Sequence, residues 1–165
     1  MTVEAGQPEG SPESMGDEPS FDDLYRLHYS RLVVLARLMT GAMASAEEIV
    51  QDAFVQLYRK WSSIEYPTTY VRIAVVNGCR SHGRRQALER RTRVPDREPE
   101  VFDTTAIAVR DALDVLTPRQ RAAVVLRYFD DLSEREIAQT LGCRPGTVKS
   151  LLARSIKKLK ESLHE

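Results

Sequence analysis

Apolar residues recur at helical spacing through three segments of the N-terminal half of the chain. In Phe21–Met39 they return every three or four residues, which predicts one long amphipathic helix. A second helix is predicted to begin at Ser45–Glu48, a Ser-x-x-Glu capping box, and to continue to Trp61. A third helix is expected from about Thr69 to the Arg84–Arg85 pair. Three amphipathic helices of this length favour one small all-α domain.

The last third of the chain has the pattern of a helix-turn-helix followed by a long basic helix. Ile107–Leu116 is predicted to form one helix, and Thr117 caps another. Ser133–Glu136 is a further capping box, Gly142 can end that helix in the left-handed conformation, and Pro145 suits the first turn of the next helix. Two short helices joined by a tight glycine-containing turn are a common way to place a recognition helix in the DNA major groove.

The final helix separates into two faces when it is read at 3.6 residues per turn. The side expected to pack inward carries Val148, Leu152, Ser155 and Leu159. From Arg144 to Lys160 there are six basic residues and no acidic one. Because an ordinary surface helix mixes both signs of charge, this asymmetry favours a polyanionic partner. The alternative is a basic surface helix on a small domain of another kind.

Charge is distributed unevenly, although the net charge of the 165 residues is zero. That total is unusual for a protein that binds DNA unaided. The first 23 residues carry seven acidic side chains and no Lys or Arg, whereas basic residues concentrate in Arg80–Arg93 and Arg144–Lys160. We expect the basic segments to bind DNA and a second partner to supply affinity.

The chain lacks the signatures of an enzyme or a metalloprotein. Cys79 and Cys143 are far apart, without a Cys or His at ligand spacing, and the three histidines are scattered. There is no glycine-rich phosphate loop and no nucleophile elbow. We therefore expect no catalysis, no metal and no cofactor. The longest apolar run, Leu32–Ala36, is too short for a membrane span, and there is no signal peptide, so a soluble, cytoplasmic protein is expected.

Composition divides the chain into four parts. Residues 1–19 are rich in Gly, Pro, Ser and Glu and are expected to be a disordered acidic tail, with Met15 as an alternative start. Residues 20–90 form the first helical domain, and 106–165 the helix-turn-helix domain. Between them, 91–105 has two prolines and alternating charges, typical of a linker. The expected fold is all-α: two small helical domains joined by a flexible linker.

Two blocks of the sequence, taken in their order, resemble the extracytoplasmic function (ECF) group of bacterial RNA polymerase sigma factors. Ala46–Trp61 is similar to the family's polymerase-binding helix, and Tyr70–Asn77 looks closest to an actinobacterial subgroup. Three further segments of this chain are similar to the family's −35 domain: Thr117–Tyr128, Leu132–Ala138 and Gly146–Ser150. The resemblance covers essentially all of the sequence expected to be ordered.

The resemblance implies a function and its partners. A member of this family binds the RNA polymerase core at the beta-prime clamp helices and the beta flap, recognises the −35 and −10 promoter elements, and helps to open the duplex. It needs no cofactor and catalyses nothing itself. The usual regulator of the family is an anti-sigma factor, and no membrane insertion is implied.

The candidate contacts follow from the resemblance together with the helix faces. For the −35 element they are Arg144, Thr147, Lys149, Ser150, Ala153, Arg154 and Lys157. For the −10 element they are Tyr70, Asn77, Arg80, Ser81, Arg84 and Arg85, opposite a core face made of Val71, Val75, Val76 and Cys79. For the polymerase they are Glu48, Gln51, Asp52, Gln56 and Arg59.

Two other functions remain open from the sequence. A dimeric helix-turn-helix regulator, which binds operators without polymerase, explains the last third but leaves Ala46–Trp61 and Arg80–Arg85 without a role. An adaptor whose helices bind another protein and no DNA would show no salt-dependent affinity for promoter DNA.

Overall fold

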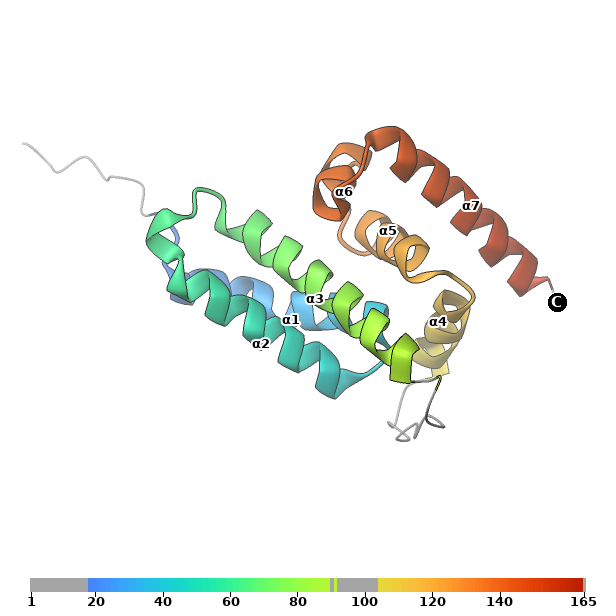
Figure 1. The fold of residues 1–165 in the computed structure, drawn as a ribbon, viewed down its shortest axis with the longest axis horizontal. Coiled ribbons are helices and arrows are strands. Elements are labelled where there is room, and N and C mark those ends of the chain that lie inside the picture. The colour runs from blue at the N-terminus through green and yellow to red at the C-terminus, as the bar shows by residue number, and fades with distance from the viewer. Residues whose placement is uncertain (1–17, 90, 92–103, 165) are drawn as a thin grey trace, which may run out of the picture.

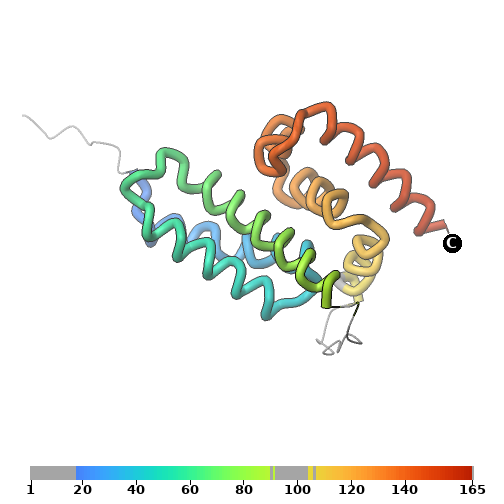
Figure 2. The backbone as a smooth tube through the Cα atoms, in the orientation of Figure 1, coloured from blue at the N-terminus to red at the C-terminus, as the bar shows by residue number. Residues whose placement is uncertain are grey.

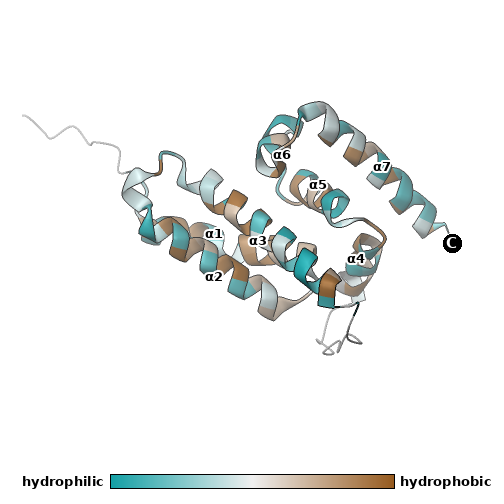
Figure 3. Cartoon of the chain, viewed as in Figure 1, coloured by the Kyte–Doolittle hydropathy of each residue, from teal (hydrophilic) through white to brown (hydrophobic). Residues whose placement is uncertain are grey.

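The structure, a computed structural model, describes residues 18–89, 91 and 104–164, and their regular elements are helices, with no strand (Figure 1). The expected acidic tail, 1–19, and linker, 91–105, lie almost wholly outside the described residues. Hydrophobic and hydrophilic residues alternate along the helices, as amphipathic helices require (Figure 3). The all-α prediction is confirmed for this part of the chain.

Three long helices pack together to form the N-terminal bundle. They are α1 (Phe21–Thr40), α2 (Met43–Arg59) and α3 (Pro67–Glu89), each in contact with the other two. A short 3-10 turn, η1 (Trp61–Ser63), follows α2. The interior is filled by aliphatic side chains that have no exposed surface: Leu35, Val50, Leu57, Val71, Val75 and Val76. The three predicted amphipathic helices therefore bury the faces that their spacing indicated.

An aromatic cluster joins the start of α1 to the end of α2. The Phe21 ring lies edge-on to Phe54, Tyr58 and Trp61, at centroid distances of 6.2, 5.1 and 5.5 Å. Tyr25 stacks on Tyr29 at 4.9 Å. Edge-to-face pairs of this kind add about 0.5–1.5 kcal/mol each beyond their burial. They hold the ends of the two helices together.

The predicted capping box at Ser45 is wrong. The helix α2 begins three residues earlier than that box requires, with Ala42 as an N-cap that offers no side-chain acceptor. Gly41, with φ +79°, ends α1 in the left-handed conformation and reverses the chain immediately. Because the next helix starts directly after this turn, Ser45 already lies within its first turn. The Thr40 hydroxyl instead accepts a hydrogen bond from the Ala42 amide, at 3.4 Å.

Four helices form the C-terminal bundle, and their local signals are confirmed. They are α4 (Thr104–Asp114), α5 (Pro118–Tyr128), α6 (Glu134–Leu141) and α7 (Pro145–Leu163). Reciprocal capping boxes start α5 at Thr117 and α6 at Ser133. Gly142, at φ +65°, ends α6, and Pro145 occupies the first turn of α7. The helix-turn-helix is therefore α6 and α7, joined by the turn at Gly142, with α5 packed against both helices.

The two bundles lie against each other. The helices α5 and α6 contact α3, and α5 also contacts α1, so that the first half of the chain covers one side of the second (Figures 1 and 2). Nothing in the periodicity of the sequence indicated this contact.

Gly78 sets the approach of α3 to α2. A Cβ added there would lie 2.7 Å from Cγ2 of Ile49, whose β-branched side chain has little rotamer freedom. We expect Gly78→Ala to lower the free energy of unfolding, because overpacking costs about 1–3 kcal/mol and the gain in helix propensity is only about 1 kcal/mol. Urea denaturation measures this change.

The matched control is Gly83→Ala on the same helix, where a Cβ meets nothing within 4 Å. It should raise the free energy of unfolding by about 0.5–1 kcal/mol. Equal gains in the two variants would contradict the close α2–α3 approach.

Candidate nucleic-acid interface

The orientation of α7 is set by its buried side. Val148 and Ser155 have no exposed surface, and the Ser155 hydroxyl donates to the Leu151 carbonyl at 2.7 Å, so its polar group is satisfied within the helix. Leu152 and Leu159 pack against the same core. The predicted inward face is therefore confirmed, and the opposite side of the helix points to solvent.

The predicted −35 residues lie together on that solvent side. Exposed members are Arg144, Lys149, Ser150, Ala153, Arg154 and Lys157, and Thr147 is half-buried. Within the described residues the four cations of this set form no hydrogen bond or ion pair. A row of exposed, unpaired cations on one helix face can bind a polyanion, because no internal contact must be broken first.

The predicted −10 residues on α3 are divided between solvent and internal contacts. Asn77, Arg84 and Arg85 are exposed, and Arg84 donates to the Ser81 hydroxyl at 3.1 Å. Two members of the set are engaged elsewhere: the Tyr70 ring packs against the core, and Arg80 Nη1 donates to the Leu141 carbonyl at 3.3 Å.

The opposite face of α3 is core, as predicted. Val71, Val75, Val76 and Cys79 are all buried. Burial raises the pKa of the Cys79 thiol to about 12, so the group stays protonated and acts as a small apolar side chain.

A groove of about 420 Å³ runs between α2 and α3 and brings together two predicted sets. Its α3 wall includes Asn77, Ser81, His82 and Arg85, from or beside the −10 set. Its α2 wall includes Glu48, Asp52 and Gln56, from the polymerase set. The other two polymerase candidates are exposed outside it, where Gln51 donates to the Tyr29 hydroxyl at 3.4 Å. Burial, and then the charge of Arg85, lower the pKa of His82.

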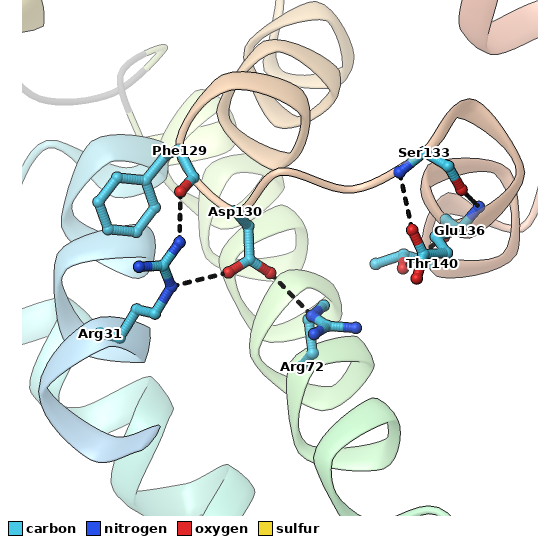
Figure 4. Close-up of polar contacts among 7 residues, drawn as sticks. All are labelled: Arg31, Arg72, Phe129, Asp130, Ser133, Glu136 and Thr140. Atoms are coloured by element: carbon cyan, nitrogen blue, oxygen red, sulfur yellow. Dashed lines mark hydrogen bonds and ion pairs between the residues drawn. The ribbon is translucent and has the colours of Figure 1, made fainter. Parts of the chain in front are cut away.

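One polar cluster was missed by the sequence reasoning and links the two bundles (Figure 4). Asp130 follows α5, and its side chain is only 9% exposed. Its Oδ1 accepts from Arg31 Nε of α1 at 3.1 Å, and its Oδ2 lies 2.8 Å from Arg72 Nε of α3. Arg31 also donates to the Phe129 carbonyl and lies over the Phe129 ring, 4.9 Å from the centroid. No spacing rule connects residues so far apart in the chain.

His28 lies at the edge of this cluster. It lines a small cavity of about 20 Å³ together with Arg31, Arg72 and Asp130. Burial and the positive charge of Arg72 lower the pKa of His28, and the Asp130 carboxylate opposes this shift. The imidazole is therefore held in its neutral form beside two arginines.

Neither a metal site nor a membrane span is found in the described residues. No group of three or more His, Cys, Asp or Glu side chains among residues 18–89 and 104–164 is placed to hold a metal ion. None of the described helices has the length and apolar character needed to cross a membrane.

Comparison with protein families matches both bundles. Residues 24–89 match Sigma-70 region 2, and residues 106–159 match Sigma-70, region 4. The chain is 31% identical to the RNA polymerase sigma-E factor of Streptomyces coelicolor over 157 residues, covering 90% of this chain and 89% of that protein. It is 37% identical to the ECF RNA polymerase sigma factor SigM of Mycobacterium tuberculosis over 153 residues, covering 87% and 77%.

Two solved structures share the fold. One is the sigma factor RpoE in complex with the anti-sigma factor NepR from Bartonella quintana, with a TM-score of 0.70, 23% identity, and coverage of 87% of this chain and 96% of that chain. The other is CnrH in complex with the cytosolic domain of CnrY, with a TM-score of 0.69, 22% identity and coverage of 90% of both chains.

The depressed pKa of His28 predicts a pH dependence of stability. Because the folded pKa lies below the unfolded value of about 6.5, the unfolded chain binds the proton more readily. The contribution of His28 is therefore complete above pH 6.5 and is lost as the pH falls toward the folded pKa. We expect the urea midpoint to drop between pH 7.5 and about 5.5, and to drop less in His28→Asn.

The pKa of His82 is lowered as well. His28→Asn should therefore remove only part of the drop in the urea midpoint, and the double variant with His82→Asn should remove more of it. Identical pH profiles for the wild type and the double variant would refute this assignment.

Proposed function

The chain belongs to the sigma-70 family, in the ECF group of RNA polymerase sigma factors, and we propose that it divides transcription initiation among three surfaces. In this proposal, α7 recognises the −35 element, α3 binds the −10 element, and the exposed polar side of α2, including its wall of the α2–α3 groove, binds the polymerase core. The observation that carries the proposal is that the exposed cations of α7 form no internal contact. The same chain also contains a bundle that matches region 2.

The proposed −35 contact uses the N-terminal half of α7. Residues at the start of a recognition helix reach base edges in the major groove. Lys149 and Arg154 are exposed there, and Arg can bind a guanine edge through two hydrogen bonds. Arg144 and Lys157 flank them and are suited to phosphates, which set the position of the helix on the duplex. The small side chains of Ser150 and Ala153 allow the helix to approach closely.

The proposed −10 contact uses the accessible part of α3. Asn77 and Ser81 offer amide and hydroxyl groups to a base edge, and Arg84 and Arg85 can neutralise phosphates. A base held outside the duplex no longer stacks with its neighbours. Its capture by the protein therefore shifts the opening equilibrium toward melted DNA, and this is how we propose that the chain promotes opening.

The proposed polymerase contact rests on charge. Glu48 and Asp52 form an acidic wall of the α2–α3 groove, and their carboxylates would repel DNA phosphates. The same wall suits a protein surface with basic side chains, such as a polymerase clamp. Gln51, Gln56 and Arg59 extend this exposed polar surface along α2.

The proposed contacts also imply a cellular location, a type of subunit and a further partner. The chain acts in the cytoplasm, where polymerase and promoter DNA are, as a non-catalytic specificity subunit without a cofactor. An anti-sigma factor is a further proposed partner, since the similar RpoE was solved with one. The region 2 match over residues 24–89 supports this proposal over an operator-binding dimer, which left that half of the chain without a role.

The double variant Lys149→Ala, Arg154→Ala tests the −35 surface. We expect it to reduce run-off transcription, with core polymerase, from a promoter that the wild type uses by about tenfold or more, since each lost base contact costs about 1–3 kcal/mol. Lys160→Ala is the control: it removes a charge from the same helix, about 16 Å beyond Lys149 and about 9 Å beyond Arg154 along the axis, and should change little. Unchanged transcription by the double variant would refute the assignment of α7.

Charge reversal on α2 tests the polymerase surface. Glu48→Arg with Asp52→Arg should weaken binding to purified core polymerase by about tenfold or more, because like charges at an interface cost several kcal/mol. Glu47→Arg is the control and is compared with Glu48→Arg alone, so that the change in charge is equal; Glu47 is exposed beside Glu48 but does not line the groove. Fluorescence anisotropy of the labelled chain measures the affinity. Equal losses in the two single variants would contradict a contact centred on the groove.

A further inference from the structure

The proposed function requires two DNA-binding faces that are far apart. Elements named −35 and −10 are separated by about 25 base pairs, or about 85 Å of duplex at 3.4 Å per base pair. Duplex DNA has a persistence length of about 150 base pairs, so it does not readily bend to bring the two elements together. The inference that follows rests on this proposed function.

The structure holds the two faces much closer than that. The helix α6 contacts both α3 and α7. Since packed helix axes lie about 8–10 Å apart, the candidate −10 and −35 faces lie within about 20–30 Å of each other. This arrangement cannot engage both promoter elements at once. It is a closed state that must open before initiation.

The chain is long enough to open without unfolding either bundle. Between Glu89, at the end of α3, and Thr104, at the start of α4, it can extend over about 50 Å at about 3.4 Å per residue. Opening therefore requires only that the contacts between the bundles break.

We propose that Asp130 is the latch of this closed, autoinhibited state. One carboxylate from the C-terminal bundle lies between Arg31 of α1 and Arg72 of α3, at 3.1 and 2.8 Å. Because only 9% of the Asp130 side chain and 20% of the Arg72 side chain are exposed, water screens this pair weakly, whereas Arg31 is half exposed and its pair is screened more. Without the carboxylate, two guanidinium groups would face the end of α5 with no anion between them, and the closed state would lose stability.

The closed state also engages a candidate −10 residue. Arg80 donates to the Leu141 carbonyl, the last residue of α6, directly before the Gly142 turn that leads into α7. In this position one guanidinium nitrogen is bound to the helix-turn-helix and is not available to a phosphate. Closing and binding of the −10 strand therefore compete for the same side chain. Polymerase, by holding the bundles apart, removes this competition.

The experiment compares Asp130→Asn with Asp131→Asn in the full chain. Both variants remove one negative charge, which by itself strengthens DNA binding, so the control isolates the latch. Asp131 is exposed, and its φ of +53° is a conformation that Asn tolerates. Small-angle scattering reports the radius of gyration, and anisotropy with a labelled random-sequence duplex of about 40 base pairs reports DNA affinity at a fixed salt concentration.

We expect Asp130→Asn to increase the radius of gyration by several ångströms and to bind the duplex at least about threefold more tightly than Asp131→Asn. Arg31→Gln breaks the latch from α1, at a side chain that is 50% exposed, and should expand the chain in the same way even if the turn after α5 tolerates no change. Circular dichroism shows whether each variant is folded. A radius of gyration equal to that of the wild type in both latch variants would overturn the proposal.

Transcription with saturating core polymerase separates this proposal from the proposed function. The template is sheared genomic DNA, from which wild-type chain and core select promoters. Both latch variants should then transcribe as well as the wild type, because polymerase has already opened the chain. No transcription by the wild type would refute the proposed function. Normal transcription together with unchanged compactness of the latch variants would refute the latch alone.

Discussion

Each candidate DNA contact on α7 depends on the burial of the opposite side of that helix. Val148 and Ser155 have no exposed surface, and rotating α7 to bury Lys149 or Arg154 would remove Val148 from the core. Placing an unpaired cation there would cost far more than the helix gains from any surface contact. The buried side chains Val148 and Ser155 therefore determine which side of α7 faces solvent and so the direction of the cations proposed to contact DNA. The capping boxes at Thr117 and Ser133 fix where the supporting helices begin.

In the N-terminal bundle, a close helix approach creates the groove that two functions share. Gly78 lets α3 approach Ile49 of α2, and beside this point the two helices leave a polar groove. Its walls differ in charge: Glu48 and Asp52 stand on α2, and Arg85 stands on α3. An acidic wall disfavours phosphates and a basic one attracts them, so adjacent walls of one groove can favour a protein and a nucleic acid respectively.

The contact between the bundles reduces the positive charge that the closed chain presents to DNA. A chain with two weak DNA-binding faces gains affinity when a scaffold holds both at the correct separation, because the second contact becomes intramolecular. In the closed arrangement, part of the positive charge is directed inward: Arg31 and Arg72 pair with Asp130, and Arg80 caps α6. Contacts between domains of one chain often resemble transient protein–protein interfaces, so relative motion of the domains is expected.

Local features of the fold could be predicted from the sequence, whereas contacts between distant segments could not. The boxes at Thr117 and Ser133 and the turn at Gly142 involve residues within a few positions, so their spacing was sufficient. The box at Ser45 failed because the end of the preceding helix, at Gly41, decided where α2 begins. Helical periodicity likewise identified the buried side of α7 and the outward side that carries its cations.

Only the tertiary structure decided what covers each buried face. It joined the α2 and α3 candidates in one groove, tied Arg80 to Leu141, and brought Arg31 and Arg72 to Asp130. A period of 3.6 residues records which side of a helix avoids water, but not which distant helix packs there. In the sequence, an arginine that stays exposed cannot be distinguished from one that forms an ion pair with a distant residue, because both occupy polar positions of a helix.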